Sequence, residues 1–327
     1  MPALATYELT KDYAIGFWRK RPYRALDALT LEVSPGEVFG FLGPNGAGKT
    51  TTLKLLMRLV FPTSGRAEIL DRPVGDAAVR RRVGYLPEHP YFYDYLTAEE
   101  LLAYFGSLFG FVGVERRRRI DRLLDEVGIG AERRLPLRKF SKGMLQRVGI
   151  AQALINDPEL IVLDEPMSGL DPLGRRDVRA LILRLRDRGC TVFFSSHVLS
   201  DAEALCSRVA IMAKGRLVTA GRLSDMLAFE LRGWEVVAAG VSSPLLASLA
   251  PQASSVTTIG EGRYTFDLPR DPGPDRFVVD VARGGATLVS VNPLRDTLED
   301  FFVRQVSAPD VVATDRGLGA APVEDRR

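Results

Sequence analysis

The clearest chemistry in the sequence lies in the stretch GPNGAGKT, which fits the pattern G-x-x-x-x-G-K-S/T between a predicted strand and a predicted helix. Glycines let backbone N–H groups turn inward around a β-phosphate, and the start of the helix adds its dipole. Lys49 can neutralise the β- and γ-phosphates, and the Thr50 hydroxyl can bind Mg²⁺. We therefore predict a nucleotide phosphate site made of Gly43, Pro44, Asn45, Gly46, Ala47, Gly48, Lys49, Thr50 and Thr51.

Two adjacent acids follow an apolar run in ELIVLDEP, residues 159–166. Such a run is typical of a buried parallel strand that brings carboxylates to its C-terminal end. Asp164 can hold Mg²⁺ and Glu165 can polarise a water, a pair that favours hydrolysis over transfer to a substrate hydroxyl. CTVFFSSH, residues 190–197, has the same form, so we expect His197 to contact the γ-phosphate at the same sheet edge.

A second helix start of the anion-binding kind occurs in FSKGMLQR, residues 140–147. A hydroxyl, a lysine and a glycine precede an amphipathic helix there. Met144 shares one face of that helix with later apolar residues, so it can belong to packing rather than to a ligand site. Because the chain already has a phosphate loop, this second helix start needs its own explanation.

Composition limits the class of protein. Hydrophobic residues at 46%, charged residues at 26% and the lack of an apolar run near ~18 residues predict a globular chain that does not cross a membrane by itself. Secretion is not expected, because the N-terminus has no basic segment followed by an apolar one. The two cysteines have no paired spacing, which argues against a disulfide framework and a cysteine-based metal site. The net charge of +3 is small and the arginine runs fit solvated faces, so no nucleic-acid partner is expected.

The pattern along the chain predicts two domains and a tail. Residues 1–230 begin with strands, continue through a helical, arginine-rich insert at about 97–157, and end in a hairpin across Lys214 and Gly215. Residues 231–306 are expected to form a small α/β accessory domain. Its predicted strands are WEVVAAG, RYTFDLP and ATLVSVNP, and its predicted helices are DRFVVDVARG and DTLEDFFVRQV. Residues 307–327 have a composition typical of disorder.

Five motifs in this order, GPNGAGKT, FSKGM, LIVLDEP, SGLD and SSHVLSDAE, resemble those of the ATP-binding subunits of ABC transporters over roughly residues 4–225. The resemblance implies an α/β P-loop ABC ATPase core with a parallel-sheet core, an antiparallel β subdomain and a helical subdomain. It implies ATP and Mg²⁺ as cofactors, Glu165 as the catalytic base and His197 as the γ-phosphate contact. It also labels 43–51 as Walker A, 140–144 as the signature motif and 168–171 as the D-loop.

Two further roles follow from the resemblance alone. An aromatic residue shortly before the first strands stacks on adenine in this family; we assign it to Tyr13, with the alternatives Tyr7, Phe17, Trp18 and Tyr23. Glu88 stands where the family usually has a glutamine that ligates Mg²⁺. A carboxylate can also ligate Mg²⁺, although it adds negative charge beside the triphosphate. His89 is expected to be an ordinary loop residue.

The resemblance gives the second helix start a purpose. In this family two ATP-binding domains face head to tail, and the signature motif of one closes on the γ-phosphate held by the Walker A loop of the other. Ser141 and Gly143 match the family pattern LSGGQ and are expected to bind that phosphate, whereas Phe140, Lys142 and Met144 depart from it. Lys142 either tightens ATP binding or points into water. The implied partner is a second ATPase domain, as a homodimer or a heterodimer.

The resemblance also implies a transmembrane permease subunit as partner and a peripheral location at the cytoplasmic face of the membrane. Docking is expected on the helical insert and on residues 84–96, where YFYDYLT offers either partner anchors or a satellite hydrophobic cluster. The C-terminal part resembles subunits of the ABC-2 export type, so we expect export. The main alternative is a soluble ABC ATPase acting on ribosomes or DNA, which a single cassette without sustained heptads disfavours. A third possibility, a small-molecule P-loop kinase, is disfavoured because Glu165 and the signature motif would have no role in it.

Overall fold

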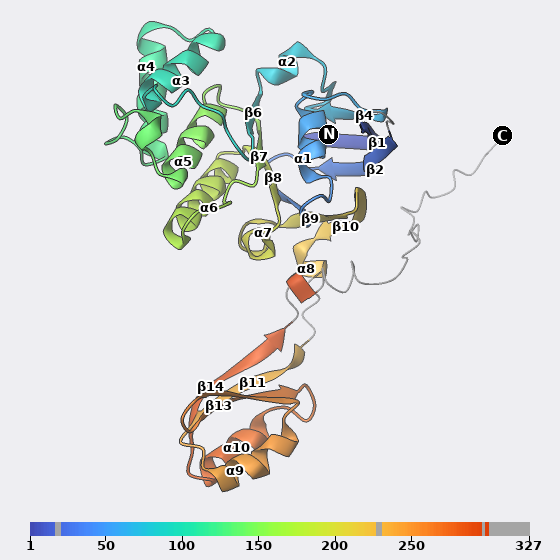
Figure 1. Cartoon of the computed structure of the whole chain (residues 1–327), viewed down its shortest axis with the longest axis vertical. Helices are drawn as coiled ribbons and strands as arrows, with labels where there is room; N and C mark the ends of the chain where they lie inside the picture. Colours follow the sequence, from blue (N-terminus) through green and yellow to red (C-terminus); the bar gives the residue numbers. More distant parts are fainter. Residues whose placement is uncertain (17–20, 227–230, 296–297, 301–327) are drawn as a thin grey trace, which may run out of the picture.

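The computed structural model describes four ranges of the 327-residue chain: 1–16, 21–226, 231–295 and 298–300 (Figure 1). The predicted tail at 307–327 and most of the predicted last helix lie outside these ranges. We call the described residues 1–226 the cassette and 231–295 the accessory part. No helix in the described ranges is both long enough and apolar enough to span a bilayer.

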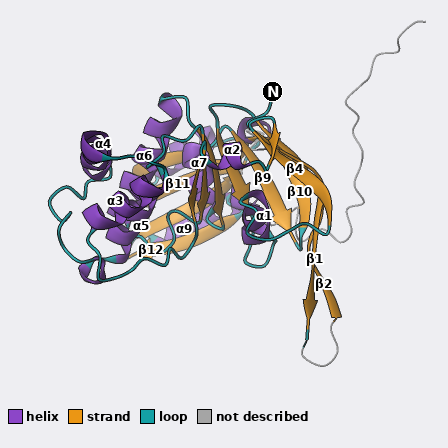
Figure 2. Ribbon diagram, turned by 90° about the horizontal axis from the view of Figure 1, so that it is seen from above, coloured by secondary structure: helices purple, strands orange, loops and turns teal. Residues whose placement is uncertain are grey.

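An antiparallel sheet of order β2-β1-β4-β5 begins the cassette. Figure 2 shows β1 and β2 extending together as a hairpin beyond the other strands. The strands are β1 (Leu4–Ile15), β2 (Arg21–Val33), β4 (Ser64–Ile69) and β5 (Arg72–Pro73). Buried leucines on β1 and β2, among them Leu9 and Leu26, pack on the central sheet.

The central sheet has six strands in the order β10-β9-β3-β8-β7-β6. Five of them run parallel, and only β10 is antiparallel, joined to β9 by the predicted hairpin at Lys214 and Gly215. The strands are β3 (Val38–Leu42), β6 (Val83–Leu86), β7 (Leu160–Asp164), β8 (Thr191–Ser196), β9 (Arg208–Ala213) and β10 (Arg216–Arg222). The parallel arrangement brings the ends of β3, β7 and β8 to one edge, as the sequence predicted.

Both faces of the parallel strands are buried. Leu160 and Val162 of β7 pack with α1 and the first sheet, while Ile161 and Leu163 pack with α5, α6 and α7. This explains why β7 reads as a continuous apolar run rather than as an alternating one. The helices are α1 (Lys49–Leu56), α2 (Ala77–Arg80), α3 (Ala98–Leu108), α4 (Gly113–Glu126), η1 (Leu137–Lys139), α5 (Lys142–Ala153), α6 (Pro172–Asp187), α7 (Leu199–Leu205) and α8 (Leu223–Met226).

The helical insert gathers α3, α4 and α5 on one side of the cassette, away from the first sheet (Figure 1). Thr97 and Glu100 form a capping box that fixes the start of α3. Ser141 caps α5 by accepting a hydrogen bond from the Met144 backbone N–H at 3.2 Å. Met144 packs against the main hydrophobic core, which confirms the packing alternative for this residue.

The accessory part has its own antiparallel sheet, of order β12-β13-β11-β14, and its own core around Val236, Phe266 and Phe277. Its elements are β11 (Leu231–Ala239), α9 (Ser243–Leu249), η2 (Ala250–Gln252), β12 (Ser255–Gly260), β13 (Arg263–Pro269), α10 (Asp275–Arg283) and β14 (Thr287–Arg295). The three predicted strands and the helix at 275–283 are present, whereas β12 and α9 were not predicted. The domain boundaries at 230 and 306 stay predictions.

The chain returns to the cassette after β14. Leu298 is fully buried in the same core as residues of α6 and α7. Its backbone N–H donates a hydrogen bond to Glu203 Oε1 on α7 at 2.7 Å. Residues 298–300 are helical. Through the burial of Leu298 and its hydrogen bond to Glu203, this short segment attaches to α7, the helix that follows His197.

We expect Leu298→Ala to lower the free energy of unfolding of the cassette by about 2–5 kcal/mol, because it leaves a cavity beside α7. Hydrogen exchange across a denaturant titration measures the effect, with lost protection expected in α7. Leu288→Ala, at a β14 residue that is 38% exposed, is the control and should leave α7 protected. Equal effects of both variants would contradict the docking of Leu298.

Candidate functional site

The predicted phosphate loop connects β3 to α1 at the C-terminal edge of the central sheet. Gly48 has a φ of 102°, and an added Cβ would lie 2.7 Å from the Ala25 carbonyl oxygen, so only glycine fits there. The Lys49 ammonium donates hydrogen bonds to the carbonyl oxygens of Gly43 at 2.7 Å and Pro44 at 3.3 Å. Loop residues and the start of α1 line an open cleft of about 370 Å³, the nucleotide cleft.

Asp164 lies at the end of β7, opposite Ser195 of β8. Ser195 Oγ donates to Asp164 Oδ1 at 2.6 Å and accepts a hydrogen bond from the Glu165 backbone N–H at 3.0 Å. Burial raises the pKa of Asp164, and the charges of Glu88 and Glu165 add to this shift, while hydrogen bonds from Ser195 and Thr50 oppose it. Asp164 Oδ2 is buried and has no hydrogen-bond partner among the described residues. The Thr50 hydroxyl lies 3.5 Å from the other oxygen, Oδ1, so an unpaired carboxylate oxygen and a hydroxyl occur together here, a donor set that suits Mg²⁺.

Glu165 brings two of the predicted motifs into contact. Its Oε1 lies 3.3 Å from Lys49 Nζ, and its Oε2 lies 2.8 Å from His197 Nδ1. The side chains of Lys49 and Glu165 are 6% and 7% exposed, so this ion pair is buried. Glu165 has a φ of 50°, a left-handed conformation that is unfavourable for a residue with a side chain and that often occurs at functional sites.

Two tyrosines lie at the rim of the nucleotide cleft. Tyr13 and Tyr23 are opposite each other on β1 and β2, and both line the cleft. Tyr7 instead lies 4.1 Å beneath the guanidinium of Arg66 and does not line it. The other two alternatives, Phe17 and Trp18, lie outside the described residues. The structure therefore brings Tyr23 into the site as well as the predicted Tyr13.

Glu88 also lines the nucleotide cleft, as Glu165 does. This location is compatible with the predicted metal role, which stays a prediction. His89 lies 3.9 Å from Glu88 and is largely exposed.

Ser195 was not predicted as a site residue. The signal for it was the pair of hydroxyls that interrupts the apolar run of β8 just before His197.

The signature motif lies outside the nucleotide cleft. Ser141, Lys142 and Gly143 line a separate cleft of about 370 Å³, the signature cleft, together with Gly169 and Asp171 of the D-loop. In the part of the chain that the structure describes, the two clefts share no lining residue. One cassette therefore presents a complete phosphate loop and, elsewhere on its surface, a second anion-binding helix start.

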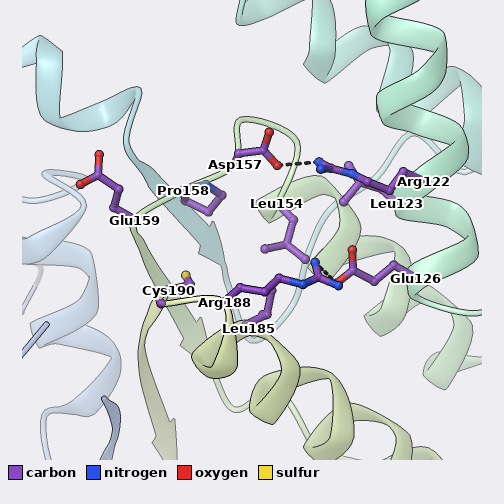
Figure 3. A pocket seen from close by; sticks show the side chains of 11 residues that line it. Arg122, Leu123, Glu126, Leu154, Asp157, Pro158, Glu159, Leu185, Arg188 and Cys190 are labelled. Atoms are coloured by element: carbon purple, nitrogen blue, oxygen red, sulfur yellow. Dashed lines mark hydrogen bonds and ion pairs between the residues drawn. The ribbon is translucent and has the colours of Figure 1, made fainter. Parts of the chain in front are cut away.

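A third cavity, of about 300 Å³, lies at the opposite edge of the central sheet, where β7 and β8 begin (Figure 3). Its charged groups are already paired: Arg122 contacts Asp157, and Arg188 contacts Glu126 at 2.8 Å. Cys190 also lines it, and burial raises the pKa of this thiol to about 11. Because its arginines are neutralised and it lacks the phosphate loop, this cavity is not a triphosphate site.

Comparisons with known proteins support the interpretation of the nucleotide cleft as an ATP-binding site. The family model described as ABC transporter matches residues 26–168, which contain the phosphate loop, the signature motif and the two acids after β7. An uncharacterized ABC transporter ATP-binding protein of Synechocystis is 47% identical over 304 residues, which cover 92% of this chain and 84% of that protein. The chain belongs to the ATP-binding subunits of ABC transporters.

Further relatives and solved structures are also ABC ATP-binding proteins. The Nod factor export ATP-binding protein I of Cupriavidus metallidurans is 35% identical over 253 residues, which cover 76% of this chain and 82% of that protein. Among solved structures, a dimeric ATP-binding cassette in a post-hydrolysis state bound to ADP and Pi is 26% identical, with a TM-score of 0.62, over 67% of this chain and 98% of that one. The predicted P-loop ABC ATPase fold is confirmed, and the ABC subunit is an ATPase of this family.

The buried Lys49–Glu165 contact leads to a prediction for the ABC subunit. ATP phosphates must compete with Glu165 for Lys49, so Glu165→Gln should lower the dissociation constant for ATP by about tenfold. Equilibrium titration with a fluorescent ATP analogue in dilute protein measures this constant. Glu88→Gln is the control, because it removes an equal charge from the same cleft without touching Lys49. If both variants bound ATP equally well, the competition would be disproved.

Proposed function

We propose that this chain is the ATP-hydrolysing subunit of an ABC exporter, that it closes head to tail with a second cassette over two ATP molecules, and that it drives a separate membrane permease. The separation of the nucleotide cleft from the signature cleft carries the proposal. Ser141 and Gly143 can reach a γ-phosphate only if a second chain supplies it. The dimeric solved relative supports this arrangement.

In the proposed site the phosphate loop binds the triphosphate through backbone N–H groups and Lys49. Tyr13 or Tyr23 stacks on adenine at the rim of the nucleotide cleft. Thr50 and Asp164, whose Oδ2 is unpaired among the described residues, would hold Mg²⁺, and Glu88 would offer a further carboxylate from the cleft lining. Mg²⁺ held there would neutralise phosphate charge.

Hydrolysis in this proposal requires Glu165 to change partners. Lys49 turns to the β- and γ-phosphates, which frees Glu165 Oε1 to accept a proton from the attacking water. His197 Nδ1 stays on Oε2 and orients the carboxylate, and the ring contacts the γ-phosphate. Ser195 positions both acids, because it bonds Asp164 and the Glu165 backbone at once.

Exposed aromatic residues support docking to a permease. Tyr91, Tyr93 and Tyr95 are 98%, 59% and 63% exposed, and the rings of Tyr93 and Tyr95 lie 5.8 Å apart, whereas Phe92 packs against the core. Aromatic side chains of this kind are frequent anchors at protein interfaces. The similarity to a Nod factor export protein supports export. The expected location is the cytoplasmic face of the membrane, as a peripheral subunit.

The head-to-tail site predicts complementation between two variants. A Ser141→Arg chain keeps its phosphate loop and a Lys49→Ala chain keeps its signature motif, so only a mixed dimer contains an intact composite site. With random pairing, about a quarter of the wild-type number of sites is intact. Nucleotide occlusion per chain measures these sites. Each variant alone should occlude none; wild-type occlusion by either alone would rule out a site shared between chains.

Copurification from detergent extracts tests the permease partner. We expect a polytopic membrane protein to copurify with the wild-type chain and to be lost when Tyr91, Tyr93 and Tyr95 are all replaced by Ser. Phe61→Ser, at another exposed aromatic residue, is the control and should retain it. Stable association with ribosomes or DNA in place of a membrane protein would overturn the proposal.

A further inference from the structure

The strand β12 forms one edge of the sheet in the accessory part. Among the described strands it pairs only with β13, and all six of its residues, Ser255–Gly260, are exposed. Val256 and Ile259 are 38% and 58% exposed. The strand contains no charged residue and no proline, and four of its residues are β-branched. Such an edge presents a row of backbone N–H and C=O groups on which a further strand can pair.

The other edge of this sheet, β14, carries two features that hinder pairing. Pro293 has no backbone N–H to donate. Val289 forms a bulge, because the register shifts where Ser290 and Leu288 pair with successive residues of β11. Proteins commonly protect strand edges in both ways. β12 contains no such proline, and its register with β13 is regular over residues 255–258, so this stretch offers a pairing surface that β14 does not.

We infer that β12 pairs with β12 of a second copy of this chain. An antiparallel pair around a two-fold axis places the same uncharged strand on both sides, so no like charges oppose each other. Each chain offers one such strand, so the contact is complete with two copies and joins two four-stranded sheets into one. The other proposed partner, the permease, is expected on the cassette at Tyr91, Tyr93 and Tyr95 rather than here.

This pairing goes beyond the proposed head-to-tail closure, because it needs no nucleotide. Its backbone hydrogen bonds lie in the accessory part, which has its own core, whereas the nucleotide cleft and the signature cleft belong to the cassette. The two subunits therefore stay joined after ATP has been hydrolysed. Each cassette is then held at a high effective concentration beside the other, which favours the next closure.

The test is sedimentation of the full chain without nucleotide and with EDTA, where we expect a dimer. Thr257→Lys and Thr257→Glu, at an exposed residue, each place like charges near the two-fold axis and should raise the dimer dissociation constant about fivefold. An equimolar mixture of the two variants should restore the wild-type constant. Thr287→Lys, at an exposed residue of β14, is the matched control and should have no effect. Ser141→Arg should also retain this dimer, because it leaves β12 intact.

Several results would overturn the inference. A monomer would do so, as would a dimer that Thr257→Lys leaves unchanged or a mixture that stays as weak as its components. Hydrogen exchange identifies any other occupant of the edge. Protection of the β12 amides in a monomer would show that one chain covers its own edge, and protection only in the complex with a copurified membrane protein would assign the edge to the permease. The head-to-tail function is judged separately by nucleotide occlusion, so a nucleotide-free dimer that occludes no ATP would reject that function and retain this pairing.

Discussion

Glu165 forms a buried ion pair with Lys49 and a second contact with the exposed His197, and it thereby connects three stretches of chain that are far apart in sequence. A charge removed from water is costly unless it is paired, so the contact requires the ends of β3, β7 and β8 to stay in fixed register. The order β3-β8-β7 supplies that register. Apolar side chains on both faces of these strands keep the three ends together.

The Lys49–Glu165 ion pair also means that the proposed hydrolysis requires a rearrangement of these two side chains. Lys49 and Glu165, the phosphate-binding lysine and the base of the proposed reaction, form an ion pair with each other. Glu165 moreover has a left-handed backbone conformation, and its backbone N–H donates a hydrogen bond to Ser195 Oγ. In the proposed reaction, nucleotide binding and activation of the base would be linked steps, because a phosphate that takes Lys49 would release Glu165.

Local patterns predicted those features that depend on neighbours in the sequence. The apolar run of β7, the phosphate loop before α1 and the cap at Ser141 are of this kind. Ser195 and Tyr23 reach the site through the pairing of strands, Asp164 with Ser195 and Tyr13 with Tyr23. The two hydroxyls before His197 are a local signal for Ser195, but the strand pairing itself is not visible in any local pattern.

The strand β12, the helix α9 and the position of the Lys142 side chain could not be predicted from local sequence patterns either. β12 is exposed along its whole length, so no buried alternation marks it, and α9 is too short for a helical period. The exposed Lys142 side chain passes beside Gly169 of another loop, a neighbour that the local sequence does not reveal, which is why the sequence left two alternatives for it. The family motifs identified the P-loop ABC ATPase core, but they contain no information on these contacts.

The return of Leu298 to the cassette has a consequence for how the protein is made. The core that surrounds α6 and α7 includes this leucine, so the cassette cannot complete its packing on the ribosome until residues 231–297 have also been synthesised. At ordinary rates of translation that delay is on the order of ten seconds. During this time the apolar site for Leu298 beside α7 stays open, and the accessory part, with its separate core, can fold first. The core of the cassette, although synthesised first, can therefore be the second of the two cores to close.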